Sequence, residues 1–304
     1  MKNVLVTGAN GFIGSWLTNF LSEKKINVYA VVRNEESNIS KIIQSPFVHI
    51  LYSDLENLLG LEKSLSQLKI DTVYHFAWEG VGGAKRSDYK VQLENIKGAC
   101  DCMVLASQIG CEKFLCAGTI SEKIAENILS METAAENNIY AISKSATNRI
   151  LKVLSRKYNI NLIWMRLANA YGPNNECGNI VNYILDNFKE GKIPELSKGD
   201  QPYDLLYIED LIEAIYLLGE KEVSKDLYYI GSGTPQTLKE IIIRIRDAYP
   251  KDVEVQFGVK PEDGLKYKKE WFEIKDLAED TGYASKFSIE DGILKTVISN
   301  VEEQ

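Results

Sequence analysis

The segment from Thr7 to Gly14 reads TGANGFIG, follows directly after an apolar run and opens a stretch of amphipathic helical periodicity. Glycines in such a segment allow a tight turn, a close approach of phosphates to the backbone, and close packing of a helix on a strand. The partial positive charge at a helix N-terminus favours the same phosphates. A glycine-rich turn without a nucleotide is the alternative, but the strand before it and the helix after it favour a dinucleotide site. The contacts are expected from Gly8, Asn10, Gly11, Phe12, Ile13 and Gly14.

The first half of the chain alternates short β-branched apolar runs with longer stretches of helical periodicity. This alternation is typical of βαβ units, in which helices cover both faces of a parallel sheet and ligands bind at the carboxyl ends of the strands. The sequence therefore predicts an α/β fold with a Rossmann-type doubly wound parallel sheet. The expected strands are Asn3–Val6, Val28–Val32, His49–Leu51, Thr72–Phe76, Lys113–Cys116 and Leu162–Met165, and helices should begin near Gly11, Leu58, Asp88, Tyr140 and Asn179.

After Arg166 the periodicity gives way to loops rich in turn-forming residues. We expect a dinucleotide-binding domain at residues 1–167 and a smaller, interleaved substrate-binding region at residues 168–204 and 234–304. Residues 205–233 should return to the large domain, with Leu205–Gly219 as one strand and helix and Leu227–Ile230 as a further strand.

Charge and hydropathy exclude several classes of protein. A formal net charge of -8 offers no basic surface for a nucleic acid. The N-terminal sequence lacks the apolar core of a signal peptide, and no apolar run is long enough to cross a bilayer. We therefore expect a cytoplasmic protein with neither a nucleic-acid nor a membrane partner.

Cysteine and histidine usage argues against a disulfide framework and against a metal site. The chain has five cysteines, an odd number, and no two of them form a CxxC pair. This usage is typical of reduced thiols in a protein core. The cysteines are Cys100, Cys102, Cys111, Cys116 and Cys177. His49 and His75 are the only histidines, and neither has a partner at metal-ligand spacing. The sequence predicts no metal site and gives little support to a Ser-His-Asp hydrolase.

The GxxGxxG spacing of the first turn, followed by further motifs in a fixed order, resembles the extended short-chain dehydrogenases, the family of nucleotide-sugar epimerases, dehydratases and reductases. The resemblance covers nearly the whole chain. It implies cofactor contacts from Asp54 and Leu55 after the third strand, from the end of the fourth strand, and from an asparagine that opens a helix. The fourth-strand residues are Phe76, Ala77 and Trp78, and the asparagine is Asn95.

Tyr140 and Lys144 lie four residues apart, so a helix places them on one face. A neighbouring cation favours the phenolate and lowers the pKa of a phenol, which suits it to proton transfer near neutral pH. The pair resembles the family's YxxxK motif, which implies that Tyr140 transfers the proton and that Lys144 also holds the nicotinamide ribose.

The family pattern implies a third catalytic group, a hydroxyl at the end of the preceding strand. It falls on Thr119, with Ser121 as the fallback because Gly118 interrupts the usual run of serines. Thr119 would hydrogen-bond the reacting sugar oxygen; a turn-capping role is the alternative. The family's 4,6-dehydratases carry an Asp and a Glu directly after this hydroxyl. Ile120 and Ser121 stand there in this chain, which disfavours dehydration.

The end of the second predicted strand indicates the preferred nicotinamide cofactor. NAD sites place an acid there for the ribose 2′-hydroxyl, whereas a 2′-phosphate needs an arginine and no acid. Arg33 follows Val32 directly, although Glu35 and Glu36 come close after it. We expect NADP (NADPH), with NAD as the alternative.

Two residues of the later chain are expected to bind substrate. Asn169 lies in a stretch, RLANAYGP, that resembles the family's sixth-strand motif, and the resemblance implies contact with the sugar. Tyr203 stands where many relatives carry an arginine that grips the pyrophosphate, so this departure weakens the case for a diphosphate-linked substrate.

Three functions share this fold. The favoured one is reduction of a 4-keto nucleotide sugar by NADPH, and the alternatives are a 4-epimerase that retains NAD and a non-catalytic dinucleotide-binding module. A homodimer is also expected, because relatives commonly pair through helices such as those starting near Asp88 and Tyr140.

Overall fold

The computed structural model describes residues 1–128, 138–176, 178–261 and 267–302, and Cys177 lies outside this range. The chain forms two compact units. The first contains Met1–Arg166 and Ile212–Tyr228, and the second contains Leu167–Leu211 and Tyr229–Gln304. The sequence predicts that residues 205–233 return to the first region, whereas the returning segment in the structure is 212–228.

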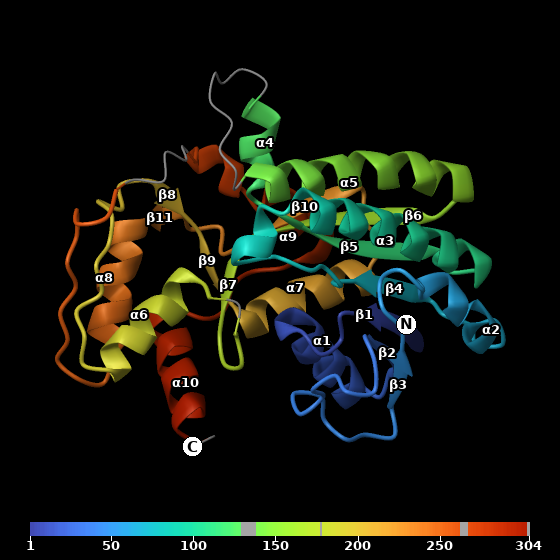
Figure 1. Cartoon of the computed structure of the whole chain (residues 1–304), viewed down its shortest axis with the longest axis horizontal. Coiled ribbons are helices and arrows are strands. Elements are labelled where there is room, and N and C mark those ends of the chain that lie inside the picture. Colours follow the sequence, from blue (N-terminus) through green and yellow to red (C-terminus); the bar gives the residue numbers. More distant parts are fainter. Residues whose placement is uncertain (129–137, 177, 262–266, 303–304) are drawn as a thin grey trace. The chain divides into compact units, whose positions relative to one another are not determined.

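The first unit is built on βαβ repeats (Figure 1). Its elements are β1 (Asn3–Thr7), α1 (Phe12–Glu23), β2 (Asn27–Val32), β3 (Val48–Tyr52), η1 (Leu58–Leu61), α2 (Glu62–Leu65), β4 (Thr72–His75), η2 (Ala84–Arg86), α3 (Tyr89–Gln108), β5 (Lys113–Thr119), α4 (Glu122–Ile128), α5 (Asn138–Tyr158) and β6 (Asn161–Leu167). The main sheet has the strand order β10-β6-β5-β4-β1-β2-β3, with β10 at Leu227–Ile230. The pairings of β1 with β2 and β4, of β2 with β3, and of β4 with β5 are parallel. The predicted doubly wound α/β fold is confirmed.

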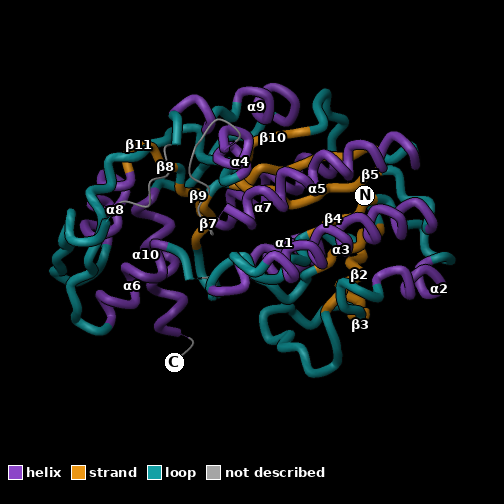
Figure 2. The backbone as a smooth tube through the Cα atoms, turned by 45° about the horizontal axis from the view of Figure 1, so that its top comes forward, coloured by secondary structure: helices purple, strands orange, loops and turns teal. Residues whose placement is uncertain are grey.

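The strand alternation of the sequence decides which side chains face α3 and α5. Leu5, Val73 and Phe114 point to this face and are fully buried, where they pack in one cluster with Met103 of α3 and Leu151 of α5. The helices α3 and α5 lie side by side over this face (Figure 2). This packing fixes the position of α5, the helix that carries the predicted catalytic pair.

The opposite face of the sheet is covered by α1 and by α7 (Ile208–Glu220). Phe20 of α1 meets Tyr216 of α7 edge to face, with ring centroids 5.4 Å apart. Gly219 permits α7 to lie against β4, because a β-carbon there would stand 1.8 Å from the hydroxyl oxygen of Tyr74. The sheet is therefore covered by helices on both faces, as a doubly wound fold requires.

The second unit contains short strands and a group of helices. Its elements are β7 (Asn169–Tyr171), α6 (Ile180–Lys189), β8 (Pro202–Tyr203), β9 (Leu205–Tyr207), β11 (Gln236–Thr237), α8 (Leu238–Ala248), η3 (Lys269–Phe272), α9 (Lys275–Thr281) and α10 (Ile289–Glu302). Strands β8 and β11 pair antiparallel. Arg244 of α8 and Glu290 of α10 form a two-point ion pair, with nitrogen-to-oxygen distances of 2.7 and 2.6 Å.

One strand prediction is wrong. Leu205–Tyr207 was expected to return to the large domain as a strand, but it pairs in parallel with β7 in a separate two-stranded sheet. The position next to β6 in the main sheet is occupied by β10, and β9 is not a strand of that sheet. Among the described residues, no helix is long and apolar enough to cross a membrane.

Candidate active site

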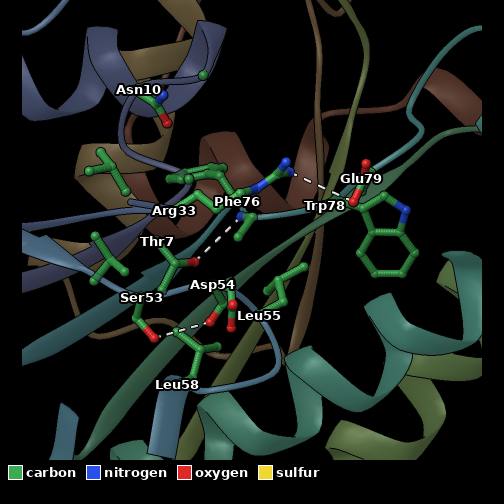
Figure 3. Close-up of a pocket in the computed structure, with 15 residues that line it drawn as sticks. Thr7, Asn10, Arg33, Ser53, Asp54, Leu55, Leu58, Phe76, Trp78 and Glu79 are labelled. Atoms are coloured by element: carbon green, nitrogen blue, oxygen red, sulfur yellow. Dashed lines mark hydrogen bonds and ion pairs between the residues drawn. The ribbon is translucent and has the colours of Figure 1, made fainter. Parts of the chain in front are cut away.

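A cavity of about 210 Å³ opens at the carboxyl ends of β1, β2, β3 and β4 (Figure 3). Most of the predicted cofactor-binding residues line it: Gly8, Asn10, Gly11, Arg33, Asp54, Leu55, Phe76, Ala77 and Trp78. The prediction omitted Thr7, Val31, Val32, Ser53, Leu58 and Glu79, which line it too. The other residues predicted to bind the cofactor are not among those that line this cavity: Phe12, Ile13, Gly14, Asn95, Tyr140 and Lys144.

Two glycines of the first turn are required by close backbone contacts. Gly8 has a φ of +68°, and a β-carbon there would stand 2.7 Å from the amide nitrogen of Ala77. A β-carbon on Gly14 would stand 2.1 Å from the carbonyl oxygen of Gly8, which explains how α1 can start directly behind the turn.

The N-terminus of α1 suits an anionic ligand. Its N-cap residue, Gly11, has no side chain to cap the first amides, and the first turn contains no acidic residue. Amides left uncapped at the positive end of a helix are a phosphate-binding arrangement. The residues of this cavity therefore fit the pyrophosphate of a dinucleotide.

The end of β2 presents a cation to the cavity. The side chain of Arg33 is 65% exposed, and its guanidinium reaches Glu79 across the cavity at 3.7 Å (Figure 3). Asp54 instead caps the turn behind it, where its carboxylate accepts hydrogen bonds from the amides of Glu56 and Asn57. The carboxylate of Asp54 is thus already used within the protein.

Helix α3 holds the loop that follows β4. The side-chain oxygen of Asn95 accepts from the Glu79 amide and its nitrogen donates to the Glu79 carbonyl, both at 2.8 Å. The indole nitrogen of Trp78 donates to Gln92 at 2.9 Å. Asn95 therefore supports the cavity by holding Glu79.

Thr7 and His75 form a buried pair below this loop. The Thr7 hydroxyl lies 2.8 Å from Nδ1 of His75. Burial, and secondarily the charge of Lys144, lowers the pKa of His75 to about 3. His75 is therefore neutral at physiological pH, and it positions Thr7 without carrying a charge.

Lys144 is buried, with 4% of its surface exposed. Its ammonium donates to the carbonyl of Ala117 at 2.7 Å and lies 3.5 Å from the ring centroid of Trp78. Burial lowers the pKa of Lys144 to about 8, while Cys116 and Glu122 act in the opposite direction. A lysine in this environment is a cation bound to β5, the strand that ends in Thr119.

Within the described residues, the ring of Tyr140 lies near the side chains of Trp78, Lys144 and Arg86. Trp78 meets it edge to face, at 6.2 Å between centroids and an interplanar angle of 89°. The Lys144 ammonium lies 6.0 Å from its centroid. The guanidinium carbon of Arg86, on η2, lies 4.0 Å from the same centroid. The predicted Tyr–Lys pair thus shares its surroundings with a second cation that the sequence reading did not include.

Thr119 ends β5, and its hydroxyl oxygen accepts from the Ser121 amide at 3.2 Å. This hydroxyl therefore caps a turn in the present structure, and its own proton can still be donated to a ligand. The amide of Thr119 donates to the carboxylate of Glu122 at 2.7 Å.

Glu122 is a fully buried carboxylate that the sequence reading missed. It accepts from the indole nitrogen of Trp164 at 3.0 Å and from Nε of Arg166 at 3.1 Å. Burial raises its pKa, and Arg166 is the main opposing influence. Glu122 thereby joins the end of β5 to β6.

Gly118 makes room for this buried group. A β-carbon at position 118 would stand 2.3 Å from the indole nitrogen of Trp164 and 2.4 Å from Oε1 of Glu122. The break in the usual run of serines therefore has a steric cause.

The two predicted substrate residues of the later chain lie in the second unit. Asn169, on β7, donates from its side chain to the Asp204 carbonyl at 3.4 Å. Tyr203, on β8, pairs with Gln236 of β11. Its neighbour Asp204 is buried and accepts from the hydroxyl of Tyr229 at 2.7 Å. This carboxylate stabilises the second unit internally.

Comparison with known proteins agrees with the geometry. The model of the NAD dependent epimerase/dehydratase family matches residues 4–231. The chain is 28% identical over 303 residues to a CDP-abequose synthase of Yersinia pseudotuberculosis, with 99% of each chain covered. It is 25% identical over 311 residues to a dTDP-4-dehydro-6-deoxyglucose reductase of Escherichia coli, with 98% of this chain and 97% of the relative covered.

Solved structures share the fold. A UDP-N-acetylglucosamine 4-epimerase from Methanobrevibacter ruminantium M1 superimposes with a TM-score of 0.81 at 19% identity, covering 100% of this chain and 99% of the other. A UDP-glucose 4-epimerase of Thermus thermophilus, solved with NAD, gives a TM-score of 0.80 at 23% identity, with 98% of each chain covered.

Proposed function

This chain belongs to the NAD dependent epimerase/dehydratase family, and from that premise we propose that it is an NADP-dependent reductase of a 4-keto nucleotide sugar. The observation that carries the proposal is that Arg33, directly after β2, lines the cavity and that no acidic residue stands at the end of this strand. The acidic residues of the cavity, Asp54 and Glu79, follow other strands. Net reduction draws on NADPH, whereas an epimerase retains its cofactor. The similarity of the sequence to a dTDP-4-dehydro-6-deoxyglucose reductase also supports a reduction.

The cofactor, when bound, supplies the hydride for the sugar carbonyl. The first turn at Gly8 and Gly11 would hold its pyrophosphate, and Arg33 would hold the 2′-phosphate of NADP. Trp78 and Ala77 line the cavity next to the first turn.

Each catalytic side chain has one task. The Tyr140 hydroxyl donates its proton to the sugar oxygen as negative charge develops there. Lys144, fixed between Ala117 and Trp78, stabilises the resulting phenolate. The Thr119 hydroxyl donates a hydrogen bond to the same oxygen, and Ser121 is the fallback for that task. Because neither Ile120 nor Ser121 can act as a carboxylic acid, elimination of water is not proposed.

The proposed substrate is a nucleotide-linked sugar, with Asn169 and Tyr203 as the residues of the second unit that contact it. Tyr203 cannot form the two charge-assisted hydrogen bonds that an arginine gives a phosphate. We therefore expect a cation elsewhere in the chain to take over this contact.

The test is consumption of NADPH with a panel of 4-keto-6-deoxy sugars linked to CDP, dTDP and UDP. We expect oxidation of NADPH with at least one of them, and NADPH affinity at least several-fold higher than NADH affinity. In Arg33→Ala the preference for NADPH should fall by about 10- to 100-fold, the usual effect of losing a charge-assisted hydrogen bond. Glu79→Gln is the matched control, since it removes the ion-pair partner of Arg33 and should leave NADPH affinity unchanged or raise it.

Two results would count against the reductase. Equal affinities of the wild type for NADPH and NADH would contradict the role of Arg33. Tightly bound NAD in the purified protein, together with interconversion of C4 epimers and no net use of NADPH, would indicate the 4-epimerase instead.

We also propose that the protein forms a homodimer through α3 and α5. Five apolar side chains on these helices are 40–66% exposed: Tyr89, Leu93, Ile142, Ile150 and Val153. Exposed apolar side chains that follow neighbouring helices are a common basis for association. We expect a mass of two chains by sedimentation equilibrium and a single chain for Val153→Glu. Val259→Glu, at an exposed valine that belongs to neither helix, should remain a dimer; a monomeric wild type would contradict the proposal.

A further inference from the structure

The loop after β4 carries two adjacent cations with different surroundings. Lys85 forms an ion pair with Glu79. Arg86 donates to the carbonyl of Val81 and forms no ion pair within the described part of the chain. Its guanidinium carbon lies 4.0 Å from the ring centroid of Tyr140. Arg86 is therefore held by the backbone against the ring of the proposed proton donor.

From this contact we propose that Arg86 is a positioning residue that fixes the ring of Tyr140 and stabilises its phenolate. The inference rests on the proposed role of Tyr140 in proton transfer and extends it to a residue outside the Tyr–Lys pair. A cation over the face of an aromatic ring is attracted by the ring, and more strongly once the phenol has lost its proton. This difference between the two protonation states is what changes a pKa.

Arg86 lies closer than Lys144 to the ring of Tyr140. The Arg86 guanidinium is 4.0 Å from the ring centroid of Tyr140, and the Lys144 ammonium is 6.0 Å from it. Lys144 also lies 3.5 Å from the ring centroid of Trp78, so part of its interaction is with another aromatic group. The planar guanidinium is the group that stacks best on an aromatic face.

Other charged groups act on the same pair from the elements around it. Glu122 of α4 and the Cys116 thiol of β5 both interact with Lys144. Neither changes in a variant of Arg86, and Lys85 remains paired with Glu79. A change in the Tyr140 titration on replacing Arg86 therefore reports the stacked cation itself.

The experiment is a titration of Tyr140 by NMR in the full chain labelled with ¹³C at the tyrosine ζ position, without substrate. The Tyr140 resonance is assigned as the one missing from Tyr140→Phe. We expect Arg86→Gln to raise the pKa of Tyr140 by about 0.5–1 unit, which corresponds to the usual strength of a cation–π contact. Arg86→Lys, which keeps the charge but not the planar group, should restore part of the shift.

Lys85→Gln is the matched control, because it removes the same net charge one residue away and should leave the titration of Tyr140 unchanged. A Tyr140 pKa that does not move in Arg86→Gln, or that moves equally in Lys85→Gln, would overturn the proposal. If Arg86→Gln does not fold, Arg86→Lys provides the test. A Tyr140 pKa in Arg86→Lys identical to that of the wild type would exclude a contribution from stacking of the guanidinium.

The pH dependence of turnover provides an independent measurement. In the direction of sugar oxidation, which needs the phenolate, kcat/KM at pH 7 should fall by about 3- to 10-fold in Arg86→Gln. In the direction of reduction, which needs the neutral phenol, the alkaline limb should move upward by the same shift. If no 4-keto sugar is reduced but the Tyr140 titration responds to Arg86, the proposed function fails and the role of Arg86 stands.

Discussion

Replacing Tyr140 with phenylalanine should lower kcat for reduction of the sugar by about 10²–10⁴, the usual cost of losing a positioned general acid. Cofactor affinity should stay nearly unchanged, because the phenylalanine ring can keep its contacts with Trp78 and Arg86. The measurement is a steady-state assay with the reactive 4-keto sugar, beside a direct titration of NADPH. Wild-type turnover in this variant would mean that the proton comes from another group.

Lys144→Ala serves as the contrasting variant for this prediction. Its ammonium bonds to Ala117 and lies against Trp78, which lines the cofactor cavity. Loss of the cation should weaken cofactor binding as well as turnover and should move the pH optimum upward, because the phenol loses a stabilising charge. Cofactor affinity therefore distinguishes the two variants: it should stay nearly unchanged in Tyr140→Phe and fall in Lys144→Ala.

Replacing Glu122 with alanine should lower the free energy of unfolding by about 3–5 kcal/mol, the usual cost of breaking a buried ion pair. The variant would leave the buried Arg166 guanidinium without this carboxylate and the Trp164 indole nitrogen without its acceptor. It would also release the Thr119 amide. The measurement is urea unfolding of both proteins at one pH, compared at equal slope.

Glu126→Ala is the matched control for Glu122. Glu126 also pairs with Arg166 but keeps 29% of its side chain exposed, so its loss should cost only about 1 kcal/mol. If the free energy of unfolding falls by a similar amount in both variants, burial does not make the Glu122 ion pair more important for stability, and the prediction is wrong.

The structural features that the sequence predicts best are those that depend only on neighbouring residues in the chain. The turn at Gly8, the strands of the main sheet and the helix that carries Tyr140 depend on glycine placement and hydrophobic periodicity, which are readable over ten to twenty residues. The end of β5 was placed at Cys116, whereas the strand continues to Thr119. The continuation consists of Ala117, Gly118 and Thr119, so no run of large apolar residues marks it.

The features that sequence reading missed depend on partners far along the chain. Leu205–Tyr207 has the composition of a strand, but three residues contain no information on which strand they pair with. Glu122 meets Arg166 across 44 positions of the sequence. Arg86 meets Tyr140 only because α3 and α5 pack together. In the sequence Glu122 stands between Ser121 and Lys123, so no local pattern indicates that its carboxylate is buried.

The fit of Trp164 and Glu122 over Gly118 limits the order in which this site can change. A serine at position 118, as the related pattern has, would place its β-carbon within 2.4 Å of both groups. Redesign of this strand end towards the commoner serine run must therefore begin by changing both Trp164 and Glu122, and only afterwards can position 118 accept a larger side chain. The reverse order passes through an intermediate that cannot pack, so Gly118→Ser alone is expected to destabilise the protein.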